Sequence, residues 1–560
     1  MAGFERATIG PRRPAAPWGV RVWARVRRAA NKLASVGLAG VLLWLGGCAS
    51  LPSQAQRTPS SAIADVAATP LARLAAASTP ADSARLSGLR LLPDAAPAFE
   101  LRLALARMAQ ASLDVQYYLI AQDDSGGQLL AALEQAARRG VRVRLLVDDL
   151  HAAASQDALL RLSALPNAEV RLFNPLPSRA SDQWAARMLL SLHEFDRVNR
   201  RMHNKLFIAD NSFAVSGGRN IGNEYAMRSA SSHFIDMDLL ASGPIVRELS
   251  ALFDRFWNSE QAYPIEVLAG GQDASRAAAA APGGSAAAQD PPGGVKAGDA
   301  LLRELASGRV ELHFAPVQLL ADAPAKAAVP GGAPLPTAMD GVLQRLGAAQ
   351  QRIEVVSPYF VPGADGMALL RAAAERRVHV ALTTNSLAST DEPMAYLGYA
   401  RYRDQMLALG VSITELSPAG APMPGLHTSL SGSVGRLHAK VATIDGRWLL
   451  VGSLNMDARS ARTNTELVLV VDSPRLAGEM AALLQAHWQH DHYKVRRVPD
   501  VAAPDAAQQA APLEAPGNAP WRTEWVGAGV PDVHHSEPRV STAQRMWFSV
   551  VSLFVPEEWL

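Results

Sequence analysis

Apolar positions along the chain form short runs and longer helical stretches that follow one another in the same order twice. In the first half, the pattern predicts a strand over 113–119, a helix over 127–139 and a strand over 141–147. In the second half, it predicts a strand over 353–360, a helix over 367–377 and a strand over 378–383. Strands alternating with helices are typical of a mixed sheet flanked by helices, so we expect an α/β fold with one such sheet in each half.

Polar residues repeat in the same two halves. A histidine, a lysine and an aspartate recur with the same internal spacing, and a small residue and an asparagine follow each set at matching distances. The first set is His203, Lys205, Asp210, Gly218 and Asn220, and the second is His438, Lys440, Asp445, Ser453 and Asn455. Arg201 and Arg436 stand two residues before the histidines. Because every pair has the same separation, a duplicated half-site is the simplest explanation.

The repeated residue types indicate a site for an anion that needs one nucleophile and one proton donor. Residues two apart on a strand share a face, so the arginine, histidine and lysine of each copy are expected to project together. If the halves face each other, two imidazoles meet in a positively charged cleft, which suits a phosphodiester. An imidazole pKa of about 6.5 allows one ring to attack phosphorus while the other protonates the leaving alkoxide. Lysine and asparagine donors would hold the phosphoryl oxygens, and we expect neither a metal nor a cofactor.

A histidine nucleophile normally has its second ring nitrogen fixed by an acceptor, so a carboxylate is expected downstream of each copy. Glu466 and Asp236 are the candidates, with Asp238 as an equal alternative to Asp236. For Arg201 and Arg436 two interpretations stay open, because an arginine beside a strand can bind a lipid phosphate or pair with a local carboxylate.

The paired pattern H-x-K-x4-D-x6-G-(G/S)-x-N resembles the phospholipase D superfamily. Residues 218–225 and 452–460 are further similar to bacterial cardiolipin synthases of the C-type branch, and the similarity spans about 85–495. The resemblance implies two pseudo-symmetric lobes with the active site at their interface. It also implies catalytic roles for His203, Lys205, His438 and Lys440, bracing roles for Asp210 and Asp445, and substrate binding by Gly218, Asn220, Ser453 and Asn455.

The activity implied by the resemblance is cardiolipin synthesis from phosphatidylglycerol and a second phospholipid. We take His203 as the nucleophile and His438 as the acid and then the base, although the pseudo-twofold symmetry makes the two nearly equivalent. Two alternatives remain: phospholipase D or nuclease activity on another diester, and a lipoprotein that binds lipid without catalysis. The acceptor lipid and the need for an accessory protein are open.

Composition narrows the class of protein. With 49% hydrophobic and 19% charged residues, the chain suits a globular protein with a sizeable core. The formal net charge is only +2, and basic residues cluster only near the amino terminus. Nucleic-acid binders usually carry a concentrated basic face, so we expect no nucleic-acid partner. Phospholipid substrates and an association with the membrane are what the resemblance implies.

The amino-terminal region predicts an export signal. Basic residues precede an apolar stretch over 33–45, which is shorter than the about 20 residues needed to cross a bilayer but fits a secretory signal. Cys48 follows it and is the only cysteine, so its most natural role is lipid attachment. Ala49 favours the outer membrane facing the periplasm, with inner-membrane retention open.

Seven segments are expected in total. They are a lipoprotein signal peptide (1–47), a flexible tether (48–84), lobe 1 (85–265), a disordered insertion (266–299), lobe 2 (300–497), a low-complexity tail (498–540) and an apolar carboxyl-terminal segment (541–560).

Overall fold

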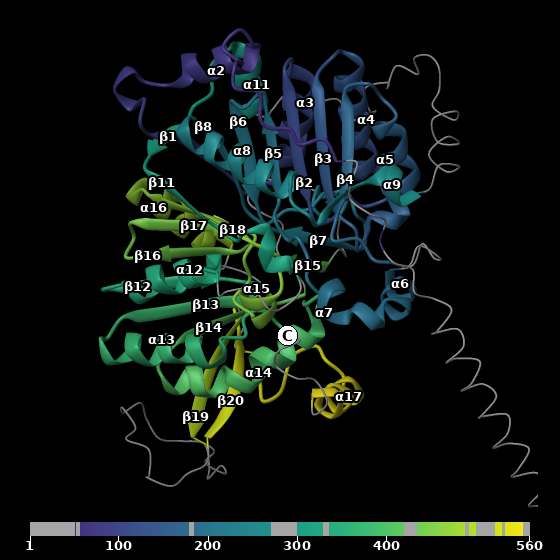
Figure 1. Ribbon diagram of the computed structural model, residues 1–560. Helices are drawn as coiled ribbons and strands as arrows, with labels where there is room; N and C mark the ends of the chain where they lie inside the picture. Colours follow the sequence, from purple (N-terminus) through teal and green to yellow (C-terminus); the bar gives the residue numbers. More distant parts are fainter. Residues whose placement is uncertain are drawn as a thin grey trace, which may run out of the picture. The chain divides into compact units, whose positions relative to one another are not determined.

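Two sheets, each carrying one copy of the repeated motif, dominate the computed structural model (Figure 1). The structure describes residues 51, 57–177, 184–269, 300–328, 335–418, 434–487, 492–499, 521–528 and 532–552. Residues 52–560 form one compact unit that holds all the elements below. The predicted signal peptide, Cys48 and residues 270–299 lie outside the described residues.

The sheet of lobe 1 has nine strands within the described residues, in the order β10-β1-β8-β6-β5-β2-β3-β4-β9. Strands β2, β3 and β4 are parallel, and their neighbours are antiparallel. The bounds are β1 Ser87–Leu92, β2 Ser112–Tyr117, β3 Arg142–Asp148, β4 Ala168–Phe173, β5 Leu206–Ala209, β6 Phe213–Gly217, β8 Asp238–Ser242, β9 Ala262–Pro264 and β10 His313–Ala315.

Helices cover both faces of this sheet. The alternation of side chains along each strand sends Leu113 and Val115 to one face, where they join one core with α3, α4, α5 and α11. Leu206 and Ile208 point to the other face, toward α8. The helices of this lobe are α2 Pro70–Ser78, α3 Ala95–Met108, α4 Asp124–Arg138, α5 Gln156–Ser163, α6 Trp184–Leu190, α7 Phe195–Val198, α8 Pro244–Trp257, α9 Ile265–Ala269 and α11 Ala300–Ser307.

The sheet of lobe 2 repeats this layout with ten strands in the described part, ordered β11-β18-β17-β16-β12-β13-β14-β19-β20-β21. The run β18-β17-β16-β12-β13-β14 therefore corresponds to β8-β6-β5-β2-β3-β4. The bounds are β11 Val317–Ala321, β12 Arg352–Val356, β13 His379–Asn385, β14 Ser412–Leu416, β16 Val441–Ile444, β17 Trp448–Gly452, β18 Leu467–Asp472, β19 His492–Pro499, β20 Trp521–Gly527 and β21 Val533–His534.

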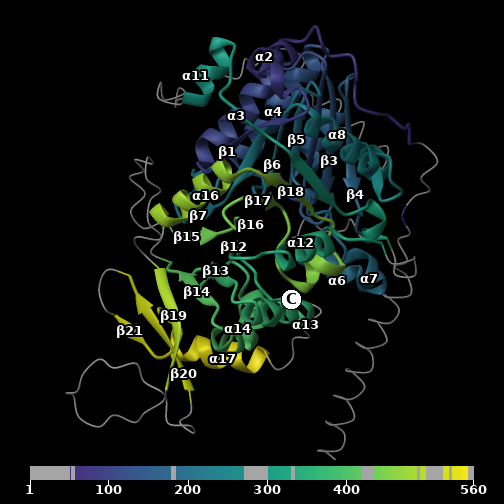
Figure 2. The ribbon, with the colours of Figure 1, turned by 90° about the vertical axis from the view of Figure 1, so that its left-hand side faces the viewer.

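The helices of lobe 2 are α12 Ala338–Gly347, α13 Gly363–Glu375, α14 Pro393–Ala408, α15 Ala458–Arg462, α16 Pro474–His487 and α17 Thr542–Ser552. A small parallel sheet joins the lobes, with β7 Ser232–Ile235 from lobe 1 and β15 Val434–Leu437 from lobe 2 (Figures 1 and 2). The predicted α/β class, with one mixed sheet per lobe, is confirmed, and all six predicted elements form with shifted ends.

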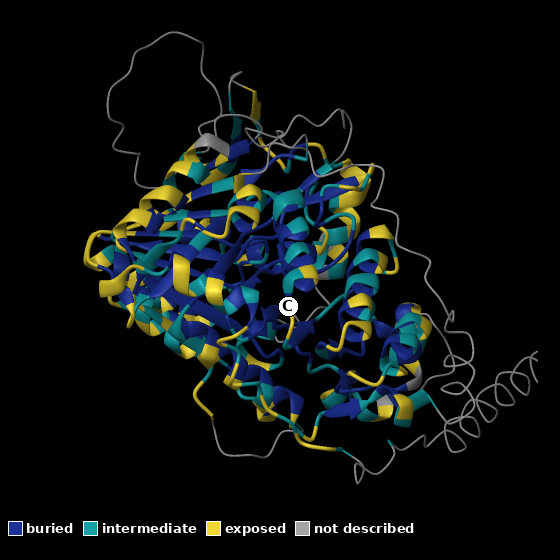
Figure 3. Cartoon of the chain, turned by 90° about the horizontal axis from the view of Figure 1, so that it is seen from above, coloured by how far each residue is buried: buried dark blue, intermediate teal, exposed yellow. Residues whose placement is uncertain are grey.

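One apolar core crosses the lobe boundary. It contains Leu206 and Leu239 from the first sheet, Leu449 and Leu467 from the second, and side chains of α8 and α16. Each of these four leucines is fully buried, and Figure 3 shows buried residues throughout the interior sheets. Burial of a leucine contributes about 1.5–3 kcal/mol, so this shared core fixes the two motifs relative to each other.

The lobe boundary differs from the prediction of residue 300. Helix α11 packs on lobe 1 through Leu301 and Leu305, and β10 pairs with β1. The chain passes to lobe 2 only at β11, which pairs with β18. Composition could not place this boundary, because α11 and β10 follow the insertion in sequence, whereas α11 buries its leucines in the core of lobe 1 and β10 pairs with β1.

The prediction of a flexible tether is wrong for residues 57–84. Ser60 and Ala62 donate backbone hydrogen bonds to Asn258 and Asp254 of lobe 1. Helix α2 begins after the N-cap Thr69 and buries Leu71 and Leu74 in the first core. The Ala-rich composition resembles a linker, yet these contacts dock the segment.

The carboxyl-terminal region also differs from a plain low-complexity tail. Strand β20 pairs with β19 and extends the second sheet, and Trp525 is buried against Glu415. Helix α17 lies next to α14, while Met546 and Trp547 remain 67% and 66% exposed. Among the described residues, no helix is both long enough and apolar enough to cross a bilayer.

Candidate active site

The two motif histidines lie just before strands rather than within them. Strand β5 begins at Leu206 and β16 at Val441, so His203 and His438 occupy the irregular backbone that leads into each strand. The strand placement expected from the sequence is therefore wrong. Each motif lysine donates to the carbonyl of its own histidine, Lys205 Nζ at 2.7 Å in lobe 1.

Each histidine is instead held by backbone of the opposite lobe. The His203 amide donates to the Thr465 carbonyl (3.0 Å), and the His438 amide donates to the Ile235 carbonyl (2.8 Å). Thr465 and Ile235 directly precede Glu466 and Asp236. The lobes thus cross at the site, and each presents its carboxylate to the motif of the other.

The histidine-carboxylate pairs follow this crossing. Nδ1 of His203 lies 3.0 Å from Glu466, and Nδ1 of His438 lies 2.6 Å from Asp236. Asp238, the alternative to Asp236, pairs with Arg102 and Arg219 instead. A carboxylate on Nδ1 fixes the tautomer and leaves Nε2 free for chemistry. Each acid therefore orients the histidine of the other motif and not the one that it follows in sequence.

Small residues of the motifs shape the carboxylate sites. The Ser453 and Ser460 hydroxyls both donate to Glu466. A Cβ added at Gly218 would lie 2.1 Å from Asp236 Oδ1, so only glycine leaves room for that carboxylate. Gly218 and Ser453, which the resemblance implied as substrate-binding residues, therefore support the carboxylates.

Burial sets the protonation state of the histidine pair. His203 and His438 are 8% and 5% exposed. Burial lowers the pKa of His203 to about 4 despite the opposing charge of Glu466, and it lowers the pKa of His438 in the same way. For Asp236, burial opposes ionisation, but the contact with His438 outweighs it and lowers the pKa to about 2. Anionic carboxylates thus face largely neutral imidazoles at neutral pH.

The lysines belong to the same electrostatic site. The pKa of Lys205 is lowered to about 7, because burial and the nearby Lys440 charge together outweigh the opposing charge of Glu466. Lys440 also lowers the pKa of His203, so the two motifs act on each other across the lobe boundary. Each ammonium has two donors left after its bond to the histidine carbonyl, and these are available to an anion.

Two asparagines offer further polar groups. Asn220 and Asn455 are each 4% exposed, and the Oδ1 atom of each is buried without a hydrogen-bond partner. Asn220 Nδ2 lies 3.1 Å from the Tyr225 hydroxyl. Buried polar groups are normally satisfied, so these amides have capacity for a bound ligand.

The motif aspartates lie at the opposite ends of the strands from the lysines. Asp210 accepts hydrogen bonds from the amides of 110–112, and Asp445 accepts from those of 350–352. Both have positive φ, 47° and 53°. Each aspartate lies five positions after its lysine, about 16 Å along an extended strand, so the aspartates brace the sheet away from the histidines.

Asp210→Asn is expected to lower the free energy of unfolding by about 2–3 kcal/mol, because a buried carboxylate loses charge-assisted bonds to three amides. Asparagine tolerates the left-handed backbone, so the substitution tests hydrogen bonding alone. Denaturant unfolding gives the value. Asp445→Asn is the matched control and should cost less, since Asp445 is partly exposed. Equal losses at both positions would contradict this account.

Arg201 and Arg436 have different surroundings. Arg201 is buried and pairs with Asp148 (3.0 Å), so its charge is neutralised within lobe 1. Arg436 lies on β15, and its Nε is buried without a hydrogen-bond partner among the described residues. Of the two open interpretations, local pairing holds for Arg201, and the structure gives Arg436 no such partner.

Aromatic residues that the sequence did not single out line both histidines. The rings of Tyr118 and His203 meet edge to face at 5.2 Å, as do those of Tyr225 and His438. Tyr359 lies 5.9 Å from Lys440 Nζ and donates to Asp391. Only Tyr225 stood near a motif in the sequence.

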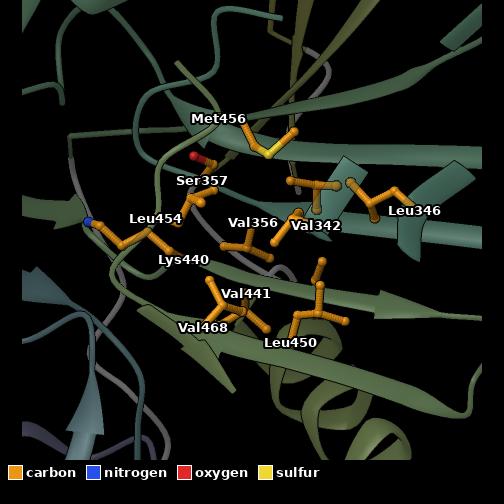
Figure 4. Close-up of a pocket in the computed structure, with 12 residues that line it drawn as sticks. Val342, Leu346, Val356, Ser357, Lys440, Val441, Leu450, Leu454, Met456 and Val468 are labelled. Atoms are coloured by element: carbon orange, nitrogen blue, oxygen red, sulfur yellow. The ribbon is translucent and has the colours of Figure 1, made fainter. Parts of the chain in front are cut away.

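A narrow apolar cavity of about 30 Å³ opens beside Lys440 in lobe 2 (Figure 4). Val356, Leu454 and Met456 are among its lining residues. This volume is enough for at least one water molecule. Within the described ranges, no group of three or more His, Cys, Asp or Glu side chains is arranged to hold a metal ion.

Comparison with known proteins places this geometry in context. The family model "Cardiolipin synthase, PLD-like domain" matches residues 103–257 and again 342–488. "Cardiolipin synthase C" of Escherichia coli K12 is 37% identical over 396 residues, covering 70% of this chain and 82% of that protein. "Cardiolipin synthase A" of Pseudomonas fluorescens Pf-5 is 25% identical over 413 residues, covering 73% and 69%. The crystal structure of phosphatidylserine synthase from Haemophilus influenzae covers 73% of this chain and 88% of its own, with 14% identity and a TM-score of 0.49.

Proposed function

Since this chain belongs to the phospholipase D-like family of cardiolipin synthases, we propose that it transfers phosphatidyl groups between phospholipids through a phosphohistidine intermediate. The product is cardiolipin, with phosphatidylglycerol as donor. The observation that supports this most strongly is the pair of buried histidines, each oriented through Nδ1 by a carboxylate of the opposite lobe.

In the first half-reaction, Nε2 of neutral His203 attacks the phosphorus of the donor. The bond from phosphorus to the headgroup oxygen breaks, and protonated His438 gives its proton to the departing alkoxide. Lys205, Lys440 and the Nδ2 groups of the two asparagines donate to the phosphoryl oxygens and stabilise the charge that builds there. An anionic donor raises the pKa of His438, which favours the protonated acid once substrate is bound.

In the second half-reaction, a hydroxyl of the acceptor attacks the phosphohistidine. His438, now neutral, takes the hydroxyl proton, the bond between phosphorus and Nε2 breaks, and His203 is restored. Water as acceptor gives hydrolysis, and a phospholipid hydroxyl gives transfer. Because the two lobes are nearly equivalent, the alternative is that His438 is the nucleophile and His203 is the acid and base.

The deciding experiment offers one preparation of the protein labelled phosphatidylglycerol, phosphatidylethanolamine, a simple alcohol and DNA. Product masses separate a phosphatidyltransferase, which forms a diphosphatidyl lipid, from a phospholipase, which releases phosphatidic acid. Cleavage of DNA alone would overturn the proposal in favour of a nuclease. Failure to form a covalent adduct with any diester would favour a non-catalytic lipid-binding lipoprotein.

The pH profile follows from the direction of the pKa shifts. His438 and Lys205 act as protonated groups, and burial lowers the pKa of both, that of Lys205 to about 7. Both protons are lost as the pH rises, so kcat/KM is expected to be falling already at a pH of about 7. The alkaline limb of kcat should lie at higher pH, because the bound diester anion raises both pKa values. A kcat/KM that rises up to a pH of about 8 would contradict this assignment.

We also propose the location of the enzyme. A lipid anchor at Cys48 after removal of 1–47 would hold the catalytic lobes at the outer membrane, facing the periplasm. The mass of the mature amino-terminal peptide from the native membrane tests this, since an unmodified Cys48 would exclude the anchor.

A further inference from the structure

The two motif arginines occupy equivalent positions but meet different residues at the end of the neighbouring strand. In lobe 1, β3 ends at Asp148, which accepts from the Met202 amide (2.8 Å) and pairs with Arg201 (3.0 Å). In lobe 2, the corresponding strand β13 ends at Asn385, which accepts from the Leu437 amide (2.9 Å). Met202 and Leu437 each follow their arginine. Asp148 and Asn385 therefore accept from equivalent backbone amides, but Asn385 also donates Nδ2 to the Leu437 carbonyl (2.9 Å), and only Asp148 carries a charge.

With asparagine in place of aspartate, Arg436 has no counter-ion among the residues that the structure describes. Across the part of the chain that the structure describes, its side chain forms no ion pair or hydrogen bond, and its Nε is buried. Residues 417–433, which lead into β15, contain no aspartate or glutamate. A partly buried guanidinium without an anion is costly unless a ligand supplies one.

Arg436 is also close to the proposed chemistry. It stands two residues before His438, and its partner in the β15–β7 ladder is Phe234. Paired residues of neighbouring strands point to the same face of a sheet, and the Phe234 ring lies 5.0 Å from the His438 ring. The guanidinium therefore leaves the sheet on the face where the acid-base histidine meets the acceptor.

We propose that Arg436 binds the phosphate of the acceptor phospholipid while the acceptor hydroxyl attacks the phosphohistidine. This inference rests on the proposed phosphatidyl transfer and names the residue that selects a phosphate-bearing acceptor over a neutral alcohol or water. A guanidinium binds phosphate by two parallel hydrogen bonds, which would also position the hydroxyl near His438. The lobes are thus alike in their histidines but differ in the charge available beside them.

The test measures how one intermediate divides between two acceptors. Full-length protein is given labelled phosphatidylglycerol together with butanol, and the ratio of cardiolipin to phosphatidylbutanol is measured. Because both products come from the same phosphohistidine, the ratio depends on acceptor choice and not on donor binding. Arg436→Gln is expected to lower the ratio about tenfold, the loss of a charge-assisted phosphate contact. Arg436→Lys should restore part of it.

Two further variants test the role of the neighbouring strand. Asn385→Asp should lower the ratio as Arg436→Gln does, because it replaces the amide that donates to the Leu437 carbonyl with a carboxylate beside the backbone next to Arg436. The matched control is the double variant Arg201→Gln, Asp148→Asn, which removes the buried pair of lobe 1 and should keep the wild-type ratio. An unchanged ratio in Arg436→Gln, or an equal fall in the control, would overturn the inference. If wild-type protein forms neither product, the proposed function itself fails.

Discussion

His203→Ala is expected to reduce phosphatidyl transfer to background, and His438→Ala to reduce it by about 10²- to 10⁴-fold. The first removes the nucleophile, whereas the second removes a general acid and base, whose contribution lies in that range. Both side chains are small parts of a large buried interface, so both variants should fold with a native near-ultraviolet spectrum. Transfer rates measured with mixed micelles of phosphatidylglycerol give the comparison.

An activated donor separates the two histidine roles. A phosphatidyl p-nitrophenyl ester has a leaving group that needs no protonation, so His438→Ala should still release nitrophenol and retain a labelled covalent adduct. His203→Ala should form no adduct. The opposite outcome would assign the nucleophile to His438, and undiminished transfer by either variant would rule out a two-histidine mechanism.

Glu466→Gln is expected to lower transfer by about 10²- to 10⁴-fold, because the amide no longer stabilises the tautomer and charge of the histidine that it orients. Because each carboxylate contacts the histidine of the other motif, each substitution should impair only the step that this histidine performs. Glu466 contacts His203, so Glu466→Gln should impair adduct formation even with the nitrophenyl ester. Asp236→Asn is the matched variant in the other lobe and should impair the ester reaction little, since Asp236 contacts His438.

The same comparison can contradict the crossed arrangement. If each acid served the histidine that it follows in sequence, Asp236→Asn would block adduct formation and Glu466→Gln would spare it. Glutamine and asparagine keep the shape of the buried side chains, so a difference between the two variants reports the histidine contact rather than loss of fold.

The sequence predicted the family and the residues of the site, but it did not predict which carboxylate contacts which histidine. The duplicated motif gave His203 and His438, and the expectation of an acceptor for each gave Glu466 and Asp236. Order in the sequence alone would pair each acid with the histidine that precedes it, Asp236 with His203 and Glu466 with His438. The observed pairs join residues of opposite lobes, because the shared apolar core turns the lobes toward each other.

Other differences between the sequence predictions and the structure also arise from contacts between segments that are distant in the chain. Arg201 looked like a member of a cationic strip, but the end of β3 brings Asp148 against it. Helix α11 follows the insertion, yet its leucines fill the first core. Residues 57–84 have the composition of a linker, but hydrogen bonds to Asn258 and Asp254 hold them on lobe 1.

The sequence by itself determined the α/β class, the two lobes and the repeated histidines, lysines and carboxylates that the proposed mechanism uses, because these depend on local periodicity and on spacing within one strand and turn. Only the tertiary structure decided which carboxylate orients which histidine, which arginine keeps a free charge and where the first lobe ends. Such contacts depend on how buried apolar surfaces dock, and the free energy of docking is summed over many residues that are distant in the chain.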